Sequence, residues 1–288
     1  KKSGRNIVIF TNQQCKIKDG YIKFPKTDLK LKTKVTDGLR QVRIVPKGCI
    51  YIIEVVYKKE IPNIIRERNR VVGIDLGLDN FATMVNNIGE IPIVINGKGI
   101  KSINQYYNKQ KSYFQSILKK QNGLDWSKRL EKLTLKRNNK MKDFMHKASR
   151  YVVNWCVKHN IDTIIIGKND NWKQKINLGK RLNQSFVQIP YNMFIQQLQY
   201  KCEEVGVKVV LTDESYTSGT SFLDGETPTK ENYDKSRRIK RGLFKSNKGI
   251  LINADVNGAY QIIKKVSPNA FADGVEGVGL HPVKLNIA

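Results

Sequence analysis

Two aspartates stand at places in the sequence where a carboxylate could bind a metal ion. Asp75 lies in the apolar stretch VVGIDLG, residues 71–77, and Asp255 opens the helical stretch NADVNGAYQIIKKV, residues 253–266. A buried charge is costly unless a cation or another partner offsets it, and Mg²⁺ prefers carboxylate oxygens as ligands. Two such carboxylates suit phosphodiester hydrolysis with a pair of Mg²⁺ ions about 4 Å apart, although a third carboxylate normally completes the site.

Each of the two aspartates also has a simpler interpretation. Asp75 could be a buried carboxylate that accepts hydrogen bonds from backbone N–H groups. Asp255 could be the N-cap of the helix that follows it, because aspartate is one of the preferred residues there. The residues around each aspartate leave both interpretations open.

The segments that carry these aspartates alternate between strand and helix patterns. Apolar runs within residues 71–97 predict three antiparallel strands, and a helical hairpin is predicted at 101–160. The order then continues with a strand at 162–167, a helix at 191–205, a strand at 207–213, the helix that Asp255 begins, and a tail at 267–288 that is expected to lie over the surface. This order predicts an RNase H-like α/β fold, whose mixed five-stranded sheet places carboxylates at adjacent strand ends.

Residues 1–62 have a different character and predict a separate domain. Short β-like runs alternate there with Gly, Asp and Pro, which is typical of a small barrel or sheet. This segment carries 15 Lys and Arg against 5 Asp and Glu, so it is a candidate surface for nucleic acid. Residues 61–70 are expected to link it to a second domain over 63–288.

The charge of the whole chain indicates a polyanionic partner. The 52 Lys and Arg residues outnumber the 25 Asp and Glu residues, which gives a formal net charge of +27. Such a field attracts nucleic acid, although a basic surface that only improves solubility is the simpler alternative. Residues 101–150 alone carry 14 basic and 3 acidic residues. We therefore expect a phosphate-facing surface on the hairpin, with contacts from Lys128, Arg129, Lys136, Arg137 and Lys140.

Two further polar stretches could also contact nucleic acid. Trp172 and Lys173, with Lys180 and Arg181, combine an aromatic ring with cations, although Trp172 could equally serve to fix its loop. The candidates that precede Asp255 and could steer DNA toward it are Arg237, Arg238 and Arg241.

The motif of residues 71–87, VVGIDLGLDNFATMVNN, and the stretch NADVNGAYQIIKKV after RRIKRGLFKSNKG resemble the RuvC nuclease core of TnpB. TnpB is the RNA-guided nuclease of bacterial insertion sequences, and Fanzor and type V CRISPR proteins are similar to it. The resemblance covers most of residues 71–266. It implies a Mg²⁺-dependent DNA endonuclease that uses two ions, with an omega-type guide RNA and target DNA as partners. Residues 1–62 likewise resemble part of the family's wedge domain, which binds the guide RNA.

The chain departs from this family at two places. Related proteins often carry a zinc knuckle before the last motif, but Ser221 and Asp224 stand there within 215–250, so no zinc is expected. At Gly167 most members have the catalytic glutamate of the second RuvC motif. Some subgroups carry an alternative glutamate on the neighbouring strand, and Glu214, after VKVVLTD, fits that description. The resemblance therefore implies that Asp75, Glu214 and Asp255 are the catalytic metal ligands.

The resulting hypothesis is an RNA-guided DNA endonuclease of a mobile element. A nuclease-inactive, RNA-guided transcriptional repressor derived from TnpB is the alternative, although the three acidic residues favour activity. The stretch GIDLG also opens the fold of actin-like ATPases, but residues 160–260 offer no second glycine-rich phosphate loop. Scattered cysteines predict a reducing cytoplasmic compartment, and the lack of an apolar run of about 20 residues predicts that the protein has no membrane partner. The resemblance to TnpB implies a bacterial, nucleoid-associated protein.

Overall fold

The computed structural model describes residues 5–61, 68–168, 188–272, 274 and 277–287. Most of the predicted linker lies outside these ranges, as does the loop with Trp172, Lys173, Lys180 and Arg181. The chain divides into two compact units, one of residues 1–61 with 110–136 and one of residues 62–109 with 137–288.

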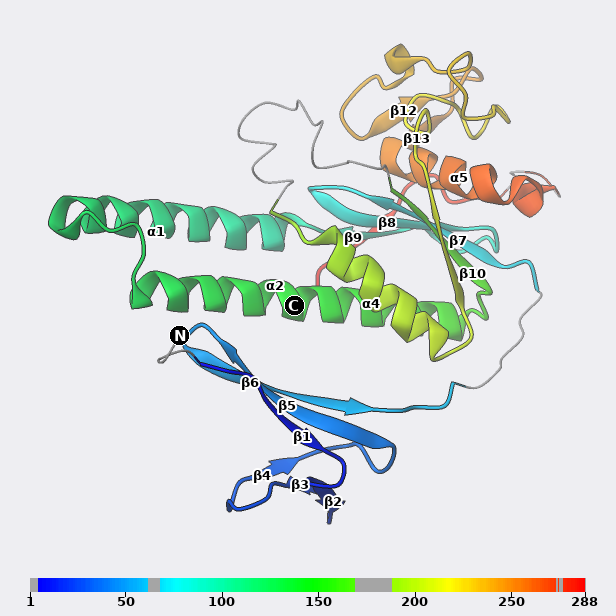
Figure 1. The fold of residues 1–288 in the computed structure, drawn as a ribbon. Coiled ribbons are helices and arrows are strands. Elements are labelled where there is room, and N and C mark those ends of the chain that lie inside the picture. The colour runs from blue at the N-terminus through cyan, green and yellow to red at the C-terminus, as the bar shows by residue number, and fades with distance from the viewer. Residues whose placement is uncertain (1–4, 62–67, 169–187, 273, 275–276, 288) are drawn as a thin grey trace. The chain divides into compact units, whose positions relative to one another are not determined.

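In the first unit, the N-terminal strands form two antiparallel sheets of three strands each, in the orders β1-β5-β6 and β2-β3-β4 (Figure 1). One small core joins the two sheets, with Cys15, Ile22, Phe24 and Val42 buried in it. This is the small β unit that the sequence predicts. Its strands are β1 (Val8–Thr11), β2 (Lys16–Lys18), β3 (Tyr21–Lys23), β4 (Lys30–Lys32), β5 (Leu39–Lys47) and β6 (Ile50–Tyr57).

The second unit is built on a mixed sheet of six strands in the order β11-β10-β7-β8-β9-β14. The strands β7, β8 and β9 form the predicted antiparallel meander, and β10 pairs in parallel with both β7 and β11. The RNase H-like arrangement is thereby confirmed. The strands are β7 (Val71–Leu76), β8 (Asn80–Asn86), β9 (Ile93–Asn96), β10 (Thr163–Gly167), β11 (Lys208–Thr212) and β14 (Val283–Leu285).

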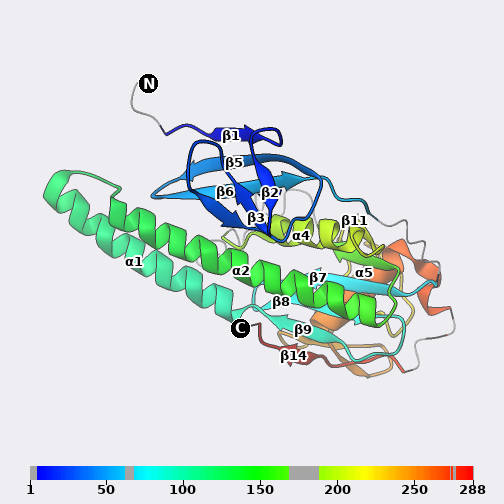
Figure 2. The same ribbon diagram turned by 90° about the horizontal axis from the view of Figure 1, so that it is seen from below.

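The prediction of five strands and a surface tail was wrong at one edge of the sheet. Val283–Leu285 pairs in parallel with β9, and the N–H of Val283 donates to the carbonyl of Pro92 at 2.8 Å (Figure 2). Gly279 lies so close to Pro92 that a Cβ there would overlap the proline ring. A three-residue strand among Gly and Pro carries too short an alternation to be recognised from the sequence.

Helices cover both faces of this sheet, with α2 and α4 on one side and α5 on the other (Figure 1). The helical hairpin consists of α1 (Lys98–Asn122) and α2 (Lys128–Lys158), and the later helices are α4 (Tyr191–Glu203) and α5 (Ala254–Val266). A two-stranded sheet precedes α5, formed by β12 (Leu243–Lys245) and β13 (Leu251–Asn253). None of the helices in the described ranges combines the length and the apolar character that a membrane span needs.

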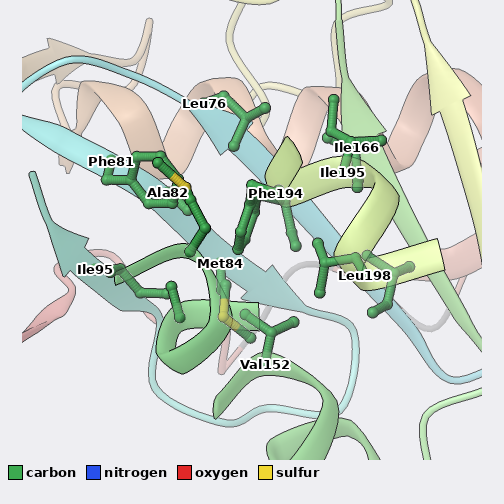
Figure 3. Close-up of a cluster of buried hydrophobic side chains, with 14 of the residues drawn as sticks. Leu76, Phe81, Ala82, Met84, Ile95, Val152, Ile166, Phe194, Ile195 and Leu198 are labelled. Atoms are coloured by element: carbon green, nitrogen blue, oxygen red, sulfur yellow. The ribbon is translucent and has the colours of Figure 1, made fainter. Parts of the chain in front are cut away.

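The side-chain alternation of the strands divides the core into two layers. Val72, Ile74 and Leu76 of β7 pack with the buried faces of α2 and α4, where Figure 3 shows Leu76 near Phe194 and Ile195. Val71, one residue before this series, packs with α5 instead. Because successive side chains in a strand point to opposite faces, Asp75 falls on the α5 side of the sheet, at the carboxyl end of β7.

Candidate active site

Asp75 lies beneath α5, where the helix comes close to the sheet. A Cβ on Gly73, two residues earlier, would come within 2.5 Å of the carbonyl oxygen of Ala259. A Cβ on Gly258 would lie 3.6 Å from Oδ2 of Asp75. These two glycines therefore allow the backbone of α5 to lie directly over the carboxyl end of β7.

Asp255 presents its carboxylate to neighbouring side chains rather than capping its helix. Asn253 is the N-cap of α5, and its Oδ1 accepts from the N–H groups of Asp255 and Val256 at 3.0 and 3.1 Å. The N-cap interpretation of Asp255 is thus wrong. Its own Oδ2 accepts from Asn80 Nδ2 at 2.7 Å, and its Oδ1 accepts from Arg238 Nη2 at 3.2 Å.

Glu214 follows β11 and reaches the end of the neighbouring strand β10. In the parallel pair, Gly167 lies opposite Thr212, two residues before Glu214. Oε2 of Glu214 lies 3.1 Å from the position that a Cβ on Gly167 would take. The N–H and hydroxyl of Thr217 both donate to the carbonyl of Glu214, at 3.2 and 2.8 Å, which fixes the turn that follows it.

Two other acidic residues near this end of the sheet are engaged elsewhere. The Asp213 side chain is 56% exposed and pairs with Lys265 at 3.1 Å. The carboxylate of Glu226 pairs with Arg237 at 2.7 Å, and both side chains are mostly buried. Glu214 is therefore the acidic residue of this region that lies beside Gly167.

One pocket of about 480 Å³ brings the three predicted carboxylates together. Asp75 comes from β7, Glu214 from the turn after β11, and Asp255 from the first turn of α5. Their neighbours in the pocket wall are mainly small polar and aromatic residues: Ser215, Tyr216, Thr217, Ser218, Tyr233, Arg238, Ala254 and Gly258. The wall thus combines acids, hydroxyls, two phenol rings and one guanidinium.

The electrostatics of the pocket oppose ionisation of two of its acids. Burial, followed by the charges of Glu214 and Asp255, raises the pKa of Asp75 well above its usual value, while Arg238 acts in the opposite direction. Burial and the charge of Asp213 raise the pKa of Glu214 to about 7, against the opposing effect of Lys265. A cation in the pocket would relieve this cost, because an opposite charge favours the ionised form.

The donor set fits a hard divalent cation, although its geometry is not that of a closed metal site. Within the described parts of the chain, no three His, Cys, Asp or Glu side chains are already arranged around a common ion position. All three acids of the pocket offer oxygen, the ligand that Mg²⁺ prefers. Each oxygen of the Asp255 carboxylate accepts one hydrogen bond, from Asn80 or Arg238, and keeps a further lone pair that could bind a cation.

The predicted nucleic-acid contacts of the hairpin fall into two groups. The side chains of Lys128, Arg129, Lys136 and Lys140 are exposed, and the guanidinium of Arg129 lies 4.1 Å from the ring centre of Phe114. Arg137 instead donates to Asn104, Asn138 and the carbonyl of Gln188 at 2.8 to 2.9 Å. This half-buried guanidinium holds the base of the hairpin together.

The three arginines before α5 also differ from one another. Arg238 lines the pocket and pairs with Asp255 at 3.2 Å. Arg241 is 77% exposed and pairs with Asp79 at 2.7 Å. Arg237 is only 18% exposed, and its pair with Glu226 fixes the loop rather than offering a cation to solvent.

Sequence reasoning missed the network around Glu226. Its carboxylate accepts from Arg237 at 2.7 Å, from the N–H of Ser221 at 2.8 Å and from Asn247 Nδ2 at 3.3 Å. Asp224 joins this network by accepting from the N–H of Asn247 at 2.7 Å. The acid therefore connects three separate segments of the region predicted to correspond to a zinc knuckle.

Two asparagines that hold the site were also missed. Besides the bond from Asn80 to Asp255, Asn257 of α5 is fully buried, accepts from the N–H of Phe222 at 3.0 Å and donates to the carbonyl of Thr220 at 2.8 Å. An asparagine two positions after Asp255, among the apolar residues of a helix that buries one face, is the sequence signal that could have indicated this contact.

Two family models match this chain, and together they span the three acids. A model described as a probable transposase, OrfB of IS605, matches residues 54–173, and a Cas12f1-like TNB domain model matches residues 191–262. The CRISPR-associated endodeoxyribonuclease Cas12f1 of Sulfoacidibacillus thermotolerans is 33% identical over 118 residues, which are 41% of this chain and 25% of that protein.

Two solved structures share the fold. The Cas12f1–sgRNA–target DNA complex matches with a TM-score of 0.59 at 15% identity, and a CRISPR-Cas12f ternary complex matches with 0.51 at 17%. Each match covers 78% of this chain and 45% of the other chain, so this chain spans less than half the length of those proteins. The first model contains the strand of Asp75, and the second contains Glu214 and the helix of Asp255. The chain is therefore similar to the OrfB transposases of IS605 and to Cas12f1 over two segments that together contain the three acids.

Proposed function

We propose that this chain is the nuclease portion of an RNA-guided DNA endonuclease of the transposon or CRISPR type. The observation that carries the proposal is the convergence of Asp75, Glu214 and Asp255, from three separate elements, on one pocket. The relative Cas12f1 is described as an endodeoxyribonuclease, and a solved relative was determined with a single guide RNA and target DNA. A net charge of +27 suits both kinds of nucleic acid.

The three carboxylates have distinct roles in this proposal. Asp75 shares the pocket with the other two acids and would contact both Mg²⁺ ions, while Glu214 and Asp255 would complete the two sets of ligands. Bound Mg²⁺ would activate a water molecule and stabilise the leaving oxygen of the phosphodiester. Arg238, which faces Asp75 and Asp255, is placed to hold a phosphate oxygen once a cation occupies the site.

Cleavage of target DNA by variants of the full-length protein with its guide RNA tests these roles. We expect Asp75→Ala, Glu214→Gln and Asp255→Ala each to lose cleavage while they still bind guide and target. Glu231→Gln is the control for Glu214, because Glu231 is an exposed acid outside the pocket wall and should leave cleavage intact.

Two results would redirect the proposal. Full cleavage by Glu214→Gln would remove Glu214 from the site and leave Asp75 and Asp255 in need of another partner. A wild-type complex that binds its target without cleaving it would indicate the RNA-guided repressor instead.

A further inference from the structure

Two tyrosines form one wall of the pocket that contains the carboxylates. The rings of Tyr216 and Tyr233 meet edge to face, with centroids 5.9 Å apart and an interplanar angle of 72°. They are 40% and 38% exposed, so each ring keeps an open surface although both line the pocket. Large apolar surface left open beside a polar site is available to a ligand.

The backbone holds Tyr216 in an unfavourable conformation. Its φ angle is +70°, in the left-handed region that a bulky residue rarely adopts. Hydrogen bonds on both sides enforce this turn: the N–H of Thr217 donates to the carbonyl of Glu214 at 3.2 Å, and the hydroxyl of Thr220 donates to the carbonyl of Tyr216 at 2.9 Å. The same turn therefore positions the Glu214 carboxylate and the Tyr216 ring.

Tyr233 reaches the pocket from a separate loop and lies against the chain at Gly219. A Cβ on Gly219 would come within 2.5 Å of the Tyr233 ring, and the N–H of Asp234 donates to the carbonyl of Gly219 at 3.0 Å. Gly219 thus leaves room for the ring at this position, and the ring cannot move further toward the turn. Both tyrosines are held at fixed positions next to the acids.

We propose that Tyr216 and Tyr233 form a stacking subsite for one unpaired base of the DNA strand, next to the phosphate that is cleaved. This inference rests on the proposed nuclease function and extends it by naming the residues that position the strand. Aromatic side chains stack on any base, provided that the base is not paired. Arg238, in the same pocket, would hold the phosphate beside that base, since a guanidinium favours phosphate oxygens. The predicted ligand is therefore single-stranded rather than duplex DNA at this site.

An abasic scan tests the subsite through cleavage. Single-stranded substrates with one abasic nucleotide at successive positions are cut by the full-length complex under single-turnover conditions. For the wild type we expect an abasic nucleotide at one position beside the cut to slow cleavage by about tenfold. Tyr216→Leu and Tyr233→Leu should slow cleavage of the intact substrate by a similar factor and then show no further loss at that position. Phenylalanine at either site should keep most of the rate.

Because the backbone of Tyr216 is strained, a glycine variant can distinguish a stacking role of its ring from a structural role. Tyr216→Gly relieves the left-handed backbone, so it should not lower the melting temperature, although it removes the ring. If Tyr216 only supports the turn, this variant keeps wild-type cleavage, and the inference is overturned. Tyr200→Leu is the matched control, since Tyr200 is 44% exposed on α4 outside the pocket wall and should behave as the wild type.

A binding measurement keeps the subsite separate from the nuclease activity. In an Asp75→Asn background, single-stranded oligonucleotides that carry 2-aminopurine at successive positions should lose fluorescence on binding at one of them, because stacking quenches this base. Tyr216→Leu should abolish the quenching and Tyr200→Leu should retain it. Quenching without any wild-type cleavage would support the subsite and refute the nuclease, whereas cleavage with no effect of either tyrosine in both assays would refute the subsite alone.

Discussion

A side chain at Gly167 would meet the carboxylate of Glu214. Oε2 of Glu214 lies 3.1 Å from the position of a Cβ on Gly167, and Cδ1 of Ile262 lies 2.5 Å from the same position. The end of β10 and the residue after β11 therefore share one small volume beside the pocket. In a parallel pair, the carboxyl ends of adjacent strands lie about 4.8 Å apart, so a side chain from either strand can fill this volume.

The first prediction concerns this shared volume. Gly167→Ala should reduce cleavage because the new methyl group displaces both Ile262 and the Glu214 carboxylate, and a displacement of about 1 Å at a catalytic group can cost on the order of a hundredfold in rate. Adding Ile262→Val should restore part of the rate by making room for the methyl group. The measurement is single-turnover cleavage by the guide-loaded protein.

Gly99→Ala is the matched control for this substitution. Gly99 lies in α1, and no atom stands within 4 Å of a Cβ placed there, so alanine should leave cleavage unchanged. Wild-type cleavage by Gly167→Ala would show that Glu214 does not need its present position.

The second prediction links the acids of the pocket to stability in the absence of metal. The pKa of Glu214 is raised to about 7, so its ionised form destabilises the metal-free fold. An acid whose pKa is raised on folding does not reduce the free energy of unfolding at a pH below its ordinary pKa. It reduces that free energy progressively as the pH rises toward its pKa in the folded state. In EDTA, wild-type stability relative to Glu214→Gln should therefore fall between pH 4.5 and pH 7. A difference on the order of 1–3 kcal/mol is expected at neutral pH.

Urea unfolding of the metal-free wild type and Glu214→Gln across this pH range provides the measurement. Mg²⁺ should raise the melting temperature of the wild type more than that of the variant, because a bound cation stabilises the folded state that holds it. Parallel pH profiles for the two proteins would contradict the prediction.

The third prediction separates two adjacent arginines. Arg237→Gln should lower stability by about 2–4 kcal/mol, because it leaves the mostly buried Glu226 carboxylate without its cation. Arg238→Gln should leave the melting temperature nearly unchanged and weaken the binding of single-stranded DNA, since its partner Asp255 lies at the pocket. Thermal unfolding and fluorescence anisotropy with a labelled oligonucleotide measure the two effects. A loss of stability in both variants would indicate that Arg238 also has a structural role.

The fourth prediction concerns the Glu226 network. Glu226→Ala should loosen residues 221–247, because it removes acceptors for Arg237, the N–H of Ser221 and Asn247 together. Hydrogen exchange should rise in that segment and remain slow in β7 and α5. Glu231→Gln is the control, since Glu231 is an exposed acid of the same region. Equal exchange in the two variants would show that the network does not hold the segment.

A last prediction concerns zinc in residues 221–247. Because the Glu226 carboxylate connects Ser221, Arg237 and Asn247, we expect zinc chelation by TPEN to leave the hydrogen exchange of residues 221–247 unchanged. Increased exchange after chelation would reveal a metal in this region and contradict the expectation.

Regular patterns made much of the fold predictable. The run VVGIDLG and the two strands after it showed the meander, and the apolar spacing of α5 showed which face it buries. The same patterns placed Asp75 and Asp255 at the ends of elements. The strand Val283–Leu285 was missed, because three residues carry no recognisable period and its pairing with β9 depends on a chain segment almost two hundred residues earlier.

The side chains around the acids were less predictable than the acids themselves. The left-handed backbone of Tyr216 and the contact of Tyr233 with Gly219 depend on a turn of irregular structure, where no periodicity constrains the side chains. Likewise, Arg137 and Arg237 are indistinguishable from other basic residues in the sequence, and only their buried partners show that they hold the structure. Counting charges thus identifies a basic region but does not show which basic side chains can contact nucleic acid.

The parallel register that sets Gly167 opposite Thr212 has a consequence for how chains of this family are compared. A sequence alignment compares residues position by position, so at residue 167 it would show glycine in place of an acid. The protein would then be classified as an inactive member. A comparison of the folded structures would instead show the carboxylate of Glu214, which follows the neighbouring strand, in the same volume. Searches for inactivated members of such families will therefore misclassify proteins unless they count acids by location in the folded molecule.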